Sequence, residues 1–311
     1  MRMKIIALDI GGTSIKSCLA ERCGAELKIL DKVRTTPLFS KEFAELKQFV
    51  LSLCERYLEN GADKIIGIST TGSVDNNETV VSAGHFKDYR GVKWGEMLLS
   101  KFGAKVKVVN DGRASAWGEY AAMLQKPHCH VHAVVGTGVG GGIIIGGKLL
   151  KGVSGQAGYI GHIKIDVSSN LRCSCGMTGC VEIFASAKGM AEKYSETVSG
   201  ITGFKKMINL FESDSERIFD VVKNGGYKLG VALGNVANII GPEVITIGGG
   251  VMAACNTLVQ KYGIENPYLA GVKEGLSCSA HRRPLVACII TEGALCNNAG
   301  LLGVAGLAAS D

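Results

Sequence analysis

Long apolar runs and blocks of basic residues are absent from this chain of 311 residues. The nearest approach to a membrane span, residues 131–150, contains seven glycines, so it is predicted to be a strand, a loop and a second strand. The basic residues are dispersed and the net charge is only +6. We therefore expect neither a membrane-spanning protein nor a nucleic-acid partner.

The N-terminus also lacks the features of a signal peptide, because its short apolar run ends at a glycine pair rather than at a cleavage site. The eleven cysteines are odd in number and eight of them are scattered, which excludes a regular disulfide framework. We expect a cytoplasmic protein with reduced cysteines. At this length, with 46% hydrophobic residues, the chain is large enough for two domains with their own cores.

The remaining three cysteines, Cys173, Cys175 and Cys180, fall within eight residues, and His162 lies eleven positions before the first of them. Thiolate and imidazole are ligands of tetrahedral zinc, and a Cys₃His set is closed, which is typical of a structural site. A disulfide knot is the alternative, which the odd cysteine count and the reducing compartment disfavour. We expect the metal to position Glu182, the next acidic residue, without binding it.

Glycine is abundant, with 43 residues, and it clusters after apolar segments. The first cluster is DIGGT at residues 9–13, in which Gly11 and Gly12 can present backbone N–H groups to phosphate while Thr13 adds a hydroxyl. Asp9 is suited to orient Mg²⁺ or its water shell. A plain hairpin is the alternative for this motif alone.

A second hairpin, GTGVGGG at residues 136–142, repeats the arrangement and contains Thr137 and Gly138. Two such hairpins facing across a cleft can hold the phosphate chain of a nucleotide. Neither is a Walker loop, because no GKS or GKT follows at the required spacing. A third glycine turn, IGGGV at residues 247–251, separates a predicted strand from a predicted helix.

The dipeptide Asn110-Asp111 ends a predicted strand and precedes a helix. A carboxylate at that place can accept the proton of an attacking hydroxyl, and the neighbouring amide can bind another hydroxyl of the same substrate. A helix cap is the alternative function of Asp111.

Strands and helices alternate along the chain, which predicts an α/β architecture in two lobes, residues 1–111 and 112–311. The final helix, 299–309, is a candidate to pack back onto the first lobe. Three histidines alternate at residues 128, 130 and 132 beside Cys129. Because Pro127 precedes them, we expect a surface turn rather than a metal site. The expected strands are 4–9, 13–19, 65–69, 106–110, 133–135, 143–145 and 244–247, and the expected helices are 41–60, 114–123, 186–194, 204–210 and 215–240.

Six motifs, in their order along the chain, resemble those of the ROK family of sugar kinases and repressors. They are DIGGT, ND, GTGVGGG, GxxGH, CxCGxxGCxE and IGGGV, and the resemblance extends from residue 4 to residue 306. The resemblance implies the actin-like ATPase fold, with two ribonuclease-H-like lobes around a cleft. It implies a homodimer that phosphorylates the 6-hydroxyl of a hexose with ATP and Mg²⁺.

The resemblance also assigns residue roles. Asp111 matches the catalytic base, and Asn110, His162 and Glu182 match sugar contacts. One nitrogen of His162 would bind zinc and the other a sugar hydroxyl, which fixes the tautomer of the ring. Nucleotide contacts are expected at Asp9, Gly11, Gly12, Thr13, Thr137, Gly138 and Gly249, and structural zinc at His162, Cys173, Cys175 and Cys180.

One position departs from the family pattern. Many members read GEIGH where this chain has GYIGH at residues 158–162, so Tyr159 replaces a carboxylate that contacts the sugar. Enteric-type N-acetylmannosamine kinases also lack that carboxylate, with histidine in its place, and they resemble this chain at residues 110–119, 147–152 and 180–186. An axial 2-acetamido group needs room there, which favours N-acetylmannosamine. The alternative substrates are glucose and N-acetylglucosamine. In that case Tyr159 is a neutral replacement that does not select the sugar.

Two other functional classes remain to be compared. A sugar-sensing repressor of the family carries a DNA-binding domain before the first glycine hairpin, and we expect none here because that hairpin begins at Asp9. A non-sugar actin-like ATPase would not account for the cysteine motif. The sequence therefore favours a sugar kinase.

Overall fold

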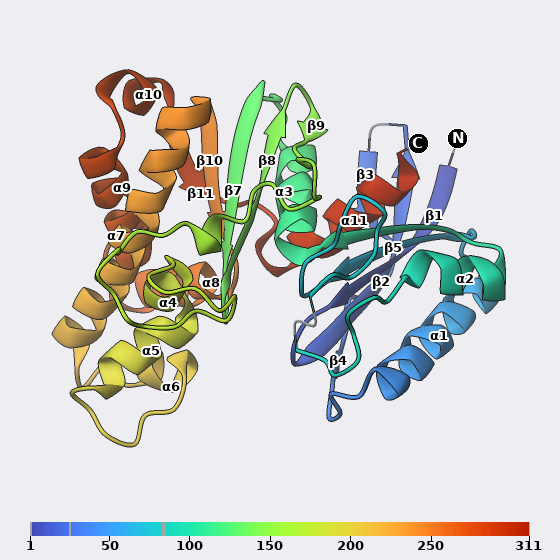
Figure 1. Ribbon diagram of the computed structural model, residues 1–311, viewed down its shortest axis with the longest axis horizontal. Coiled ribbons are helices and arrows are strands. Elements are labelled where there is room, and N and C mark those ends of the chain that lie inside the picture. Colours follow the sequence, from blue (N-terminus) through green and yellow to red (C-terminus); the bar gives the residue numbers. More distant parts are fainter. Residues whose placement is uncertain (1, 25, 83–84, 311) are drawn as a thin grey trace. The chain divides into compact units, whose positions relative to one another are not determined.

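The computed structural model describes residues 2–24, 26–82 and 85–310, which form two compact units (Figure 1). Unit 1 comprises Met1–Leu124, Leu149–Gly158 and Asn298–Asp311, and unit 2 comprises Gln125–Lys148 and Tyr159–Asn297. Among the described residues, no helix combines the length and the apolar character that crossing a membrane requires.

Unit 1 is built on a six-stranded sheet in the order β3-β2-β1-β5-β6, with β4 paired to β2. β1 and β2 form the expected antiparallel hairpin, while β1, β5 and β6 run parallel. Parallel strands end at the same edge of a sheet, so Asp9, Ser69 and Asn110 come to one edge. The strands are β1 (Arg2–Ile10), β2 (Ser14–Cys23), β3 (Glu26–Ile29), β4 (Arg34–Pro37), β5 (Ile65–Thr70) and β6 (Lys105–Asn110).

Both faces of this sheet are buried, which explains why its central strands are almost continuously apolar. Ile6 and Leu8 of β1 pack in one core with α1 (Phe43–Glu59) and α2 (Trp94–Phe102). Ile5 and Ala7, which point to the other face, pack with α3 (Asp111–Ala122) and α11 (Ala299–Ala309).

Helices α3 and α11 approach each other through glycines. A Cβ atom on Gly118 would overlap the carbonyl of Ala299, and one on Gly303 would overlap the carbonyl of Ala114. Only glycine allows two helix backbones to come so close. The C-terminal helix is therefore one of the layers of unit 1.

Unit 2 contains a second sheet, in the order β11-β10-β7-β8-β9. β7 and β8 form the second expected antiparallel hairpin, and β7, β10 and β11 run parallel. The strands are β7 (Cys129–Val135), β8 (Val139–Ile145), β9 (Lys148–Leu149), β10 (Val244–Gly248) and β11 (Ile289–Glu292).

The helices of unit 2 include the long α7 (Ser215–Ile240), which packs closely along α9 (Pro267–Ser279). A Cβ atom on Gly226 would overlap the carbonyl of Tyr268, so this contact too depends on glycine. The other helices are α4 (Glu182–Ala185), α5 (Ala187–Ser195), α6 (Phe204–Asn209), α8 (Gly250–Tyr262) and α10 (Arg282–Ala287), with 3₁₀ turns η1 (Ile160–His162) and η2 (Cys296–Asn298).

The division of the chain differs from the boundary predicted after Asp111. Unit 1 continues through α3 to Leu124 and also takes in Leu149–Gly158 and α11. The physical reason is the close packing of α3 on α11, which ties both helices to the first sheet. Sequence periodicity detects helices but not the sheet on which they pack.

The alternating histidines correct a second expectation. His130 and His132 do not lie in a surface turn: they are on β7, fully buried, and only His128 is exposed. Nε2 of His130 and Nδ1 of His132 both lie 2.8 Å from Oγ1 of Thr246 on β10. Burial lowers the pKa of His130 to about 4 and that of His132 to about 3.

This pair should make folding sensitive to acid. Below the ordinary histidine pKa of 6.5, the unfolded chain binds protons that the folded chain excludes until about pH 4. The free energy of unfolding should therefore decrease as the pH decreases from 6.5 to about 4, by up to about 1.4 kcal/mol per pH unit for each histidine. Urea denaturation at several pH values would measure this slope.

The control is a triple variant, His130→Leu, His132→Phe and Thr246→Val, which removes all three polar groups together. Its stability should fall less steeply between pH 6.5 and 4 than that of the wild type. His128→Leu, at the exposed member of the series, should leave the slope unchanged. Equal slopes for the triple variant and the wild type would contradict the prediction.

Candidate functional site

The first glycine turn places a carboxylate at the end of β1. Ser69 Oγ donates a 2.7 Å hydrogen bond to Oδ1 of Asp9. Burial raises the pKa of Asp9, and the bond from Ser69 partly offsets the rise. An ideal Cβ atom on Gly300 would lie 3.5 Å from this carboxylate, so the first turn of α11 lies beside it. The turn is closed by a 3.0 Å bond from Gly11 N–H to the Ser14 carbonyl.

Two basic side chains lie against the same turn. A Cβ atom on Gly12 would overlap the imidazole of His85, and the Lys41 ammonium donates to the carbonyl of Gly12. The close approach of His85 therefore requires glycine at position 12. Thr13, at the tip of the turn, is exposed.

Asp111 is the first residue of α3, directly after the end of β6. Its Oδ1 accepts hydrogen bonds from Asn110 Nδ2 at 2.9 Å and from Gly112 N–H at 2.8 Å. Asn110 also donates to the Gly72 carbonyl at 2.9 Å and caps the helix. Burial raises the pKa of Asp111 to about 7, with a further contribution from the negative charge of Asp9. The group is therefore an orientated carboxyl that titrates near neutral pH.

Arg113, two residues after Asp111 on α3, is a buried residue that sequence reasoning missed. Its Nη1 donates to the carbonyl of Gly155. The stretch Leu149–Gly158 is also held by Asn76, whose Nδ2 donates to the Gly152 carbonyl at 2.9 Å. The sequence shows only an arginine two residues after Asp111, and its burial, which calls for a partner, is visible in the structure alone.

The second glycine turn connects β7 to β8. Gly136 N–H donates to the Gly138 carbonyl at 2.9 Å, which closes the turn and leaves Thr137 exposed at its tip. Glu182, the first residue of α4, supports the turn from the side. Its Oε2 accepts a 3.0 Å hydrogen bond from Val139 N–H, and a Cβ atom on Gly138 would lie only 2.5 Å from that oxygen.

The third glycine turn lies next to the second. Gly249, between β10 and α8, has a φ of +97°, and a Cβ atom there would overlap the backbone of Val135 at the end of β7. Glycine is thus needed both for its conformation and for the close contact. The glycine turns predicted at residues 136–138 and 249 are neighbours within unit 2.

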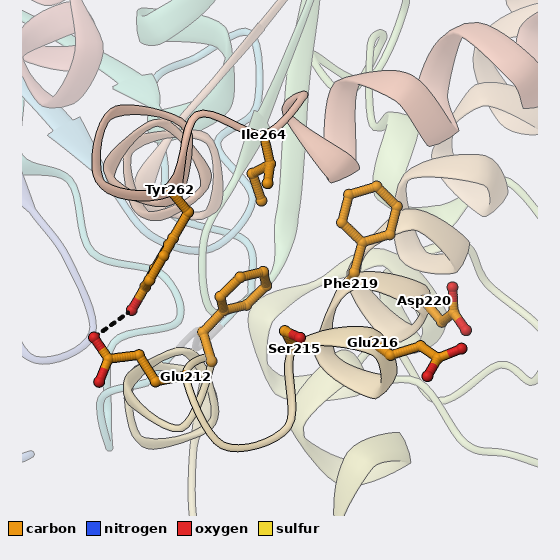
Figure 2. A pocket seen from close by; sticks show the side chains of 8 residues that line it. Glu212, Ser215, Glu216, Phe219, Asp220, Tyr262 and Ile264 are labelled. Atoms are coloured by element: carbon orange, nitrogen blue, oxygen red, sulfur yellow. Dashed lines mark hydrogen bonds between the residues drawn. The ribbon is translucent and has the colours of Figure 1, made fainter.

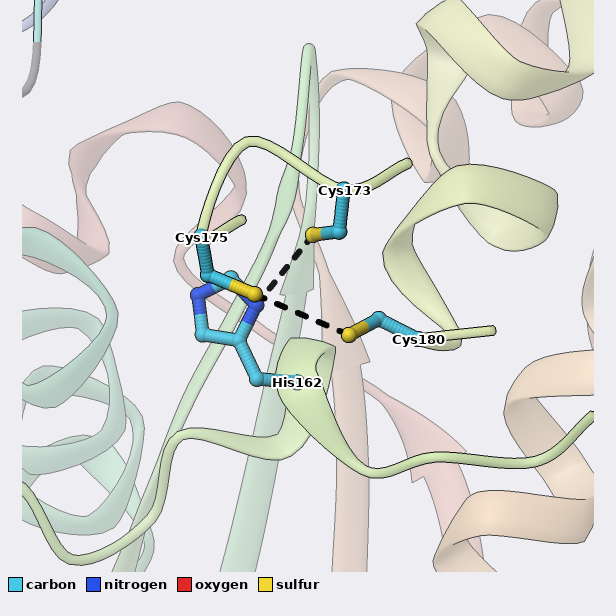
Figure 3. A group of neighbouring side chains, drawn as sticks. All are labelled: His162, Cys173, Cys175 and Cys180. Carbon is cyan, nitrogen blue, oxygen red and sulfur yellow. Dashed lines mark hydrogen bonds between the residues drawn. The ribbon is translucent and has the colours of Figure 1, made fainter. Parts of the chain in front are cut away.

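The four predicted metal ligands form one cluster (Figure 3). The ligand atoms of His162, Cys173, Cys175 and Cys180 all lie within 4.8 Å of one another. Nδ1 of His162 is 3.5 Å from the Cys173 sulfur, and the sulfurs of Cys175 and Cys180 are 3.7 Å apart. Three thiols and one imidazole converging on a point fit a closed tetrahedral zinc site.

The loop that carries the cysteines is folded by its glycines. Gly176 and Gly179 have φ values of +89° and +73°, and a Cβ atom on Gly179 would overlap the carbonyl of Asp166. A 2.8 Å bond from Cys173 N–H to the Met177 carbonyl closes the turn that contains the first two cysteines. The CxCGxxGC spacing therefore supplies both the ligands and the turns that bring them together.

Tyr159 and His162 stack their rings, with centroids 6.1 Å apart and an interplanar angle of 21°. Because Nδ1 of His162 faces the cysteines, Nε2 is on the other side of the ring. Gly161, between them, packs so closely on β8 that a Cβ atom would overlap the carbonyl of Val139.

The predicted site residues therefore fall into two groups, one in each unit. Sequence reasoning missed Ser69 and His85, which are distant in sequence from the motifs, and Ser174, which lies within the cysteine motif and donates a 2.8 Å hydrogen bond to Oε1 of Glu182. Unit 1 contains Asp9, Gly11, Gly12, Thr13, Asn110 and Asp111. Unit 2 contains Thr137, Gly138, Tyr159, His162, Cys173, Cys175, Cys180, Glu182 and Gly249.

A hollow of about 520 Å³ lies elsewhere in unit 2, where the start of α7 approaches the end of α8 (Figure 2). Aromatic rings of Phe211, Phe219 and Tyr262 line it, and Glu212 accepts a 3.1 Å bond from the Tyr262 hydroxyl. Among the described residues, none of those predicted for the site belongs to its lining. The hollow is thus separate from the motifs to which the sequence analysis assigned site residues.

Comparison with known proteins identifies one family, whose matching members include sugar kinases and a xylose repressor from Bacillus spizizenii that is 32% identical over 58% of this chain and 47% of the relative. The ROK family model matches residues 5–311. A glucokinase from Halalkalibacterium halodurans is 30% identical over 275 residues, which are 82% of this chain and 82% of the relative. An N-acetylmannosamine kinase from Shigella flexneri is 30% identical over 312 residues, which are 98% of each chain.

Among solved structures, a ROK family glucokinase from Streptomyces griseus, in complex with glucose and AMPPNP, aligns with a TM-score of 0.78. The identity is 25%, and the alignment covers 98% of both chains. The fold class predicted from the motifs is therefore confirmed: the chain has the actin-like ATPase fold.

Proposed function

This chain belongs to the ROK family, and from that premise we propose that it is a sugar kinase that uses ATP to phosphorylate the 6-hydroxyl of N-acetylmannosamine. The observation that carries the proposal is Asp111. Its carboxyl is half-buried and fixed by two hydrogen bonds to Oδ1, and its pKa is raised to about 7. A general base works best when its pKa lies near the working pH.

In the proposed reaction, the carboxylate of Asp111 accepts the proton of the sugar 6-hydroxyl. The oxygen forms a bond to the γ-phosphorus of ATP, the bond from that phosphorus to the bridging oxygen breaks, and ADP leaves. Asn110 orients the base through its 2.9 Å bond to Oδ1. Positioning and electrostatics supply most of the catalysis in phosphoryl transfer.

The nucleotide is proposed to bind through the glycine turns and the exposed hydroxyls of Thr13 and Thr137. Asp9 is the proposed residue for Mg²⁺, which would neutralise phosphate charge. The Streptomyces griseus relative, crystallised with AMPPNP, supports a nucleotide site in this fold. We propose Gly249 as a further nucleotide contact, and its turn adjoining the second hairpin supports this.

The sugar is proposed to contact Asn110, His162, Glu182 and Tyr159. With Nδ1 of His162 turned to the cysteines, Nε2 is the nitrogen suited to a sugar hydroxyl. Zinc at the cluster would fix the imidazole tautomer so that Nε2 carries the hydrogen. The glucokinase and the N-acetylmannosamine kinase are each 30% identical to this chain, so overall similarity does not choose the sugar. Tyr159 is the feature that favours N-acetylmannosamine.

We predict that N-acetylmannosamine gives the highest kcat/KM among four sugars, the others being N-acetylglucosamine, glucose and mannose. Coupled measurement of ADP release would test it. Discrimination of about 10⁴-fold requires buried polar groups that the wrong sugar leaves unpaired. We expect a clear but smaller preference, because Tyr159 replaces a carboxylate rather than adding a dedicated partner.

The variant Tyr159→Glu should shift the ratio of kcat/KM values towards glucose or N-acetylglucosamine. Tyr194→Phe, at a buried tyrosine whose hydroxyl donates to Asp214 at 2.7 Å, is a control that should leave the ratio unchanged. A wild-type preference for glucose would contradict the proposal and indicate a glucokinase. Tyr159 would then have no role in selecting the sugar. The expected cytoplasmic location and homodimer stay predictions.

A further inference from the structure

Val139, the first residue of β8, is held from two sides by segments that carry predicted metal ligands. Its N–H donates to Oε2 of Glu182, two residues after Cys180. Its carbonyl is in contact with Gly161, the residue before His162. Val139 directly follows the second glycine turn. The segment of the first metal ligand, His162, and the segment of the last, Cys180, therefore both contact the residue next to the proposed phosphate-binding turn.

The other oxygen of Glu182 faces the cysteine loop. Ser174, between Cys173 and Cys175, donates a 2.8 Å hydrogen bond to Oε1, and the Cys173 sulfur lies 3.5 Å from the same atom. Each oxygen of the carboxylate thus bonds a different segment. A carboxylate has about four acceptor positions, so these bonds leave capacity for a sugar hydroxyl as well.

We propose that Glu182 is a positioning residue that couples the metal cluster to the second glycine turn, so that metal and nucleotide bind cooperatively. The proposal rests on the assignment of this turn to nucleotide phosphate. With the ligands joined by a metal, the loop at Ser174 is fixed, and Glu182 has a fixed donor on that side. The Val139 amide then meets an acceptor held in one place, which keeps the turn in one conformation.

Without the metal, the loop gains conformational freedom and Glu182 can leave the Val139 amide. Nucleotide binding must then order both the turn and the loop, which weakens affinity. Coupling between two binding sites is reciprocal, so nucleotide must strengthen metal binding by the same factor. Couplings of this kind commonly lie between about fivefold and 150-fold. We expect the lower end, about fivefold to tenfold, because a single carboxylate carries most of the connection.

The first experiment measures the Kd of ADP by calorimetry on zinc-loaded and zinc-depleted protein. Zinc depletion should raise the Kd of the wild type about fivefold to tenfold. Ser174→Ala, which keeps all four ligands, should bind ADP more weakly than wild type at full zinc content, and depletion should then change its Kd by less than threefold. Equal Kd values for loaded and depleted wild type would overturn the proposal.

Ser168→Ala is the matched control. Ser168 is also exposed and also donates a 2.8 Å bond to a carboxylate, that of Asp166, but the Val139 amide donates to Glu182 and not to this carboxylate. Its coupling should equal that of the wild type. If depleted protein unfolds, the comparison of Ser174→Ala with Ser168→Ala at full zinc content decides, and equal ADP affinities there reject the proposal.

A second measurement needs no depleted protein. Competition with a chromophoric chelator gives the Kd of zinc with and without saturating ADP, and ADP should lower it by the factor found for ADP itself. An unchanged zinc Kd contradicts the coupling. Failure of the proposed function looks different, because zinc-loaded wild type would then bind no ADP at all.

Discussion

Asp111→Asn should reduce kcat by about 10²- to 10⁴-fold while sugar binding is largely retained. Asparagine has the shape of aspartate and can still accept the bonds from Asn110 and Gly112, so the helix start should keep its structure. It cannot take up the proton of an attacking hydroxyl. Coupled ADP release would measure kcat, and calorimetry would measure sugar binding.

The control is Asp63→Asn, the same chemical change at an exposed carboxylate before β5, whose Oδ2 accepts from Lys4 N–H. It should leave kcat within a factor of two of wild type. An Asp111→Asn enzyme that keeps more than about half of the wild-type kcat would remove Asp111 from the role of base.

The pH profile gives the same assignment an independent readout. A base with a pKa near 7 is protonated in acid, so kcat/KM should fall as the pH drops through about 7. The charge of Asp9 contributes to the raised pKa of Asp111. In Asp9→Asn the acid limb of the remaining activity should therefore move to lower pH.

Loss of the metal should have the second large effect. Purified wild type should contain about one zinc per chain, as one closed Cys₃His set requires. Cys175→Ser should lose most of this zinc, because a neutral hydroxyl replaces a thiolate ligand. At free zinc 1,000-fold above the wild-type Kd, the loss should lower the free energy of unfolding by about 4 kcal/mol. Elemental analysis and urea denaturation are the measurements.

Cys23→Ser, at an exposed cysteine on β2, changes a thiol outside the cluster and should leave zinc content and stability unchanged. Sugar binding should weaken in Cys175→Ser alone, because His162 and Glu182 lose their anchoring. Wild-type protein that is fully active without zinc would refute the site.

The sequence was most informative where the relevant residues are adjacent. The hairpins around residues 9–13 and 136–142 were predictable because an apolar run, a glycine turn and a second apolar run identify a hairpin locally. The ligand cluster was predictable because its cysteines lie within eight residues. Helix α7 was predicted with its observed bounds from a long helical periodicity.

Long-range pairing was not predictable in the same way. Periodicity could not show that α3 packs on α11, because glycine contacts such as Gly118 with Ala299 join residues far apart in the chain. The histidines were assigned to a surface turn because Pro127 precedes them, whereas His130 and His132 lie on β7 and Thr246 on another strand lies within hydrogen-bond distance of one nitrogen of each ring. Helix α2 and helix α9 were not predicted, and the bond from Glu182 to Val139 has no signature in either local segment.

The glycine contact between α3 and α11 also sets an order for folding during synthesis. Translation at about 5–20 residues per second needs on the order of 10–40 s to proceed from the end of α3 to α11. During that time Ile5 and Ala7 of β1 have no helix α11 to cover them. All of unit 2, in contrast, has been synthesised before α11 begins. The half of the protein that starts first is therefore finished last, and its open sheet face is the surface a nascent-chain chaperone would have to shield.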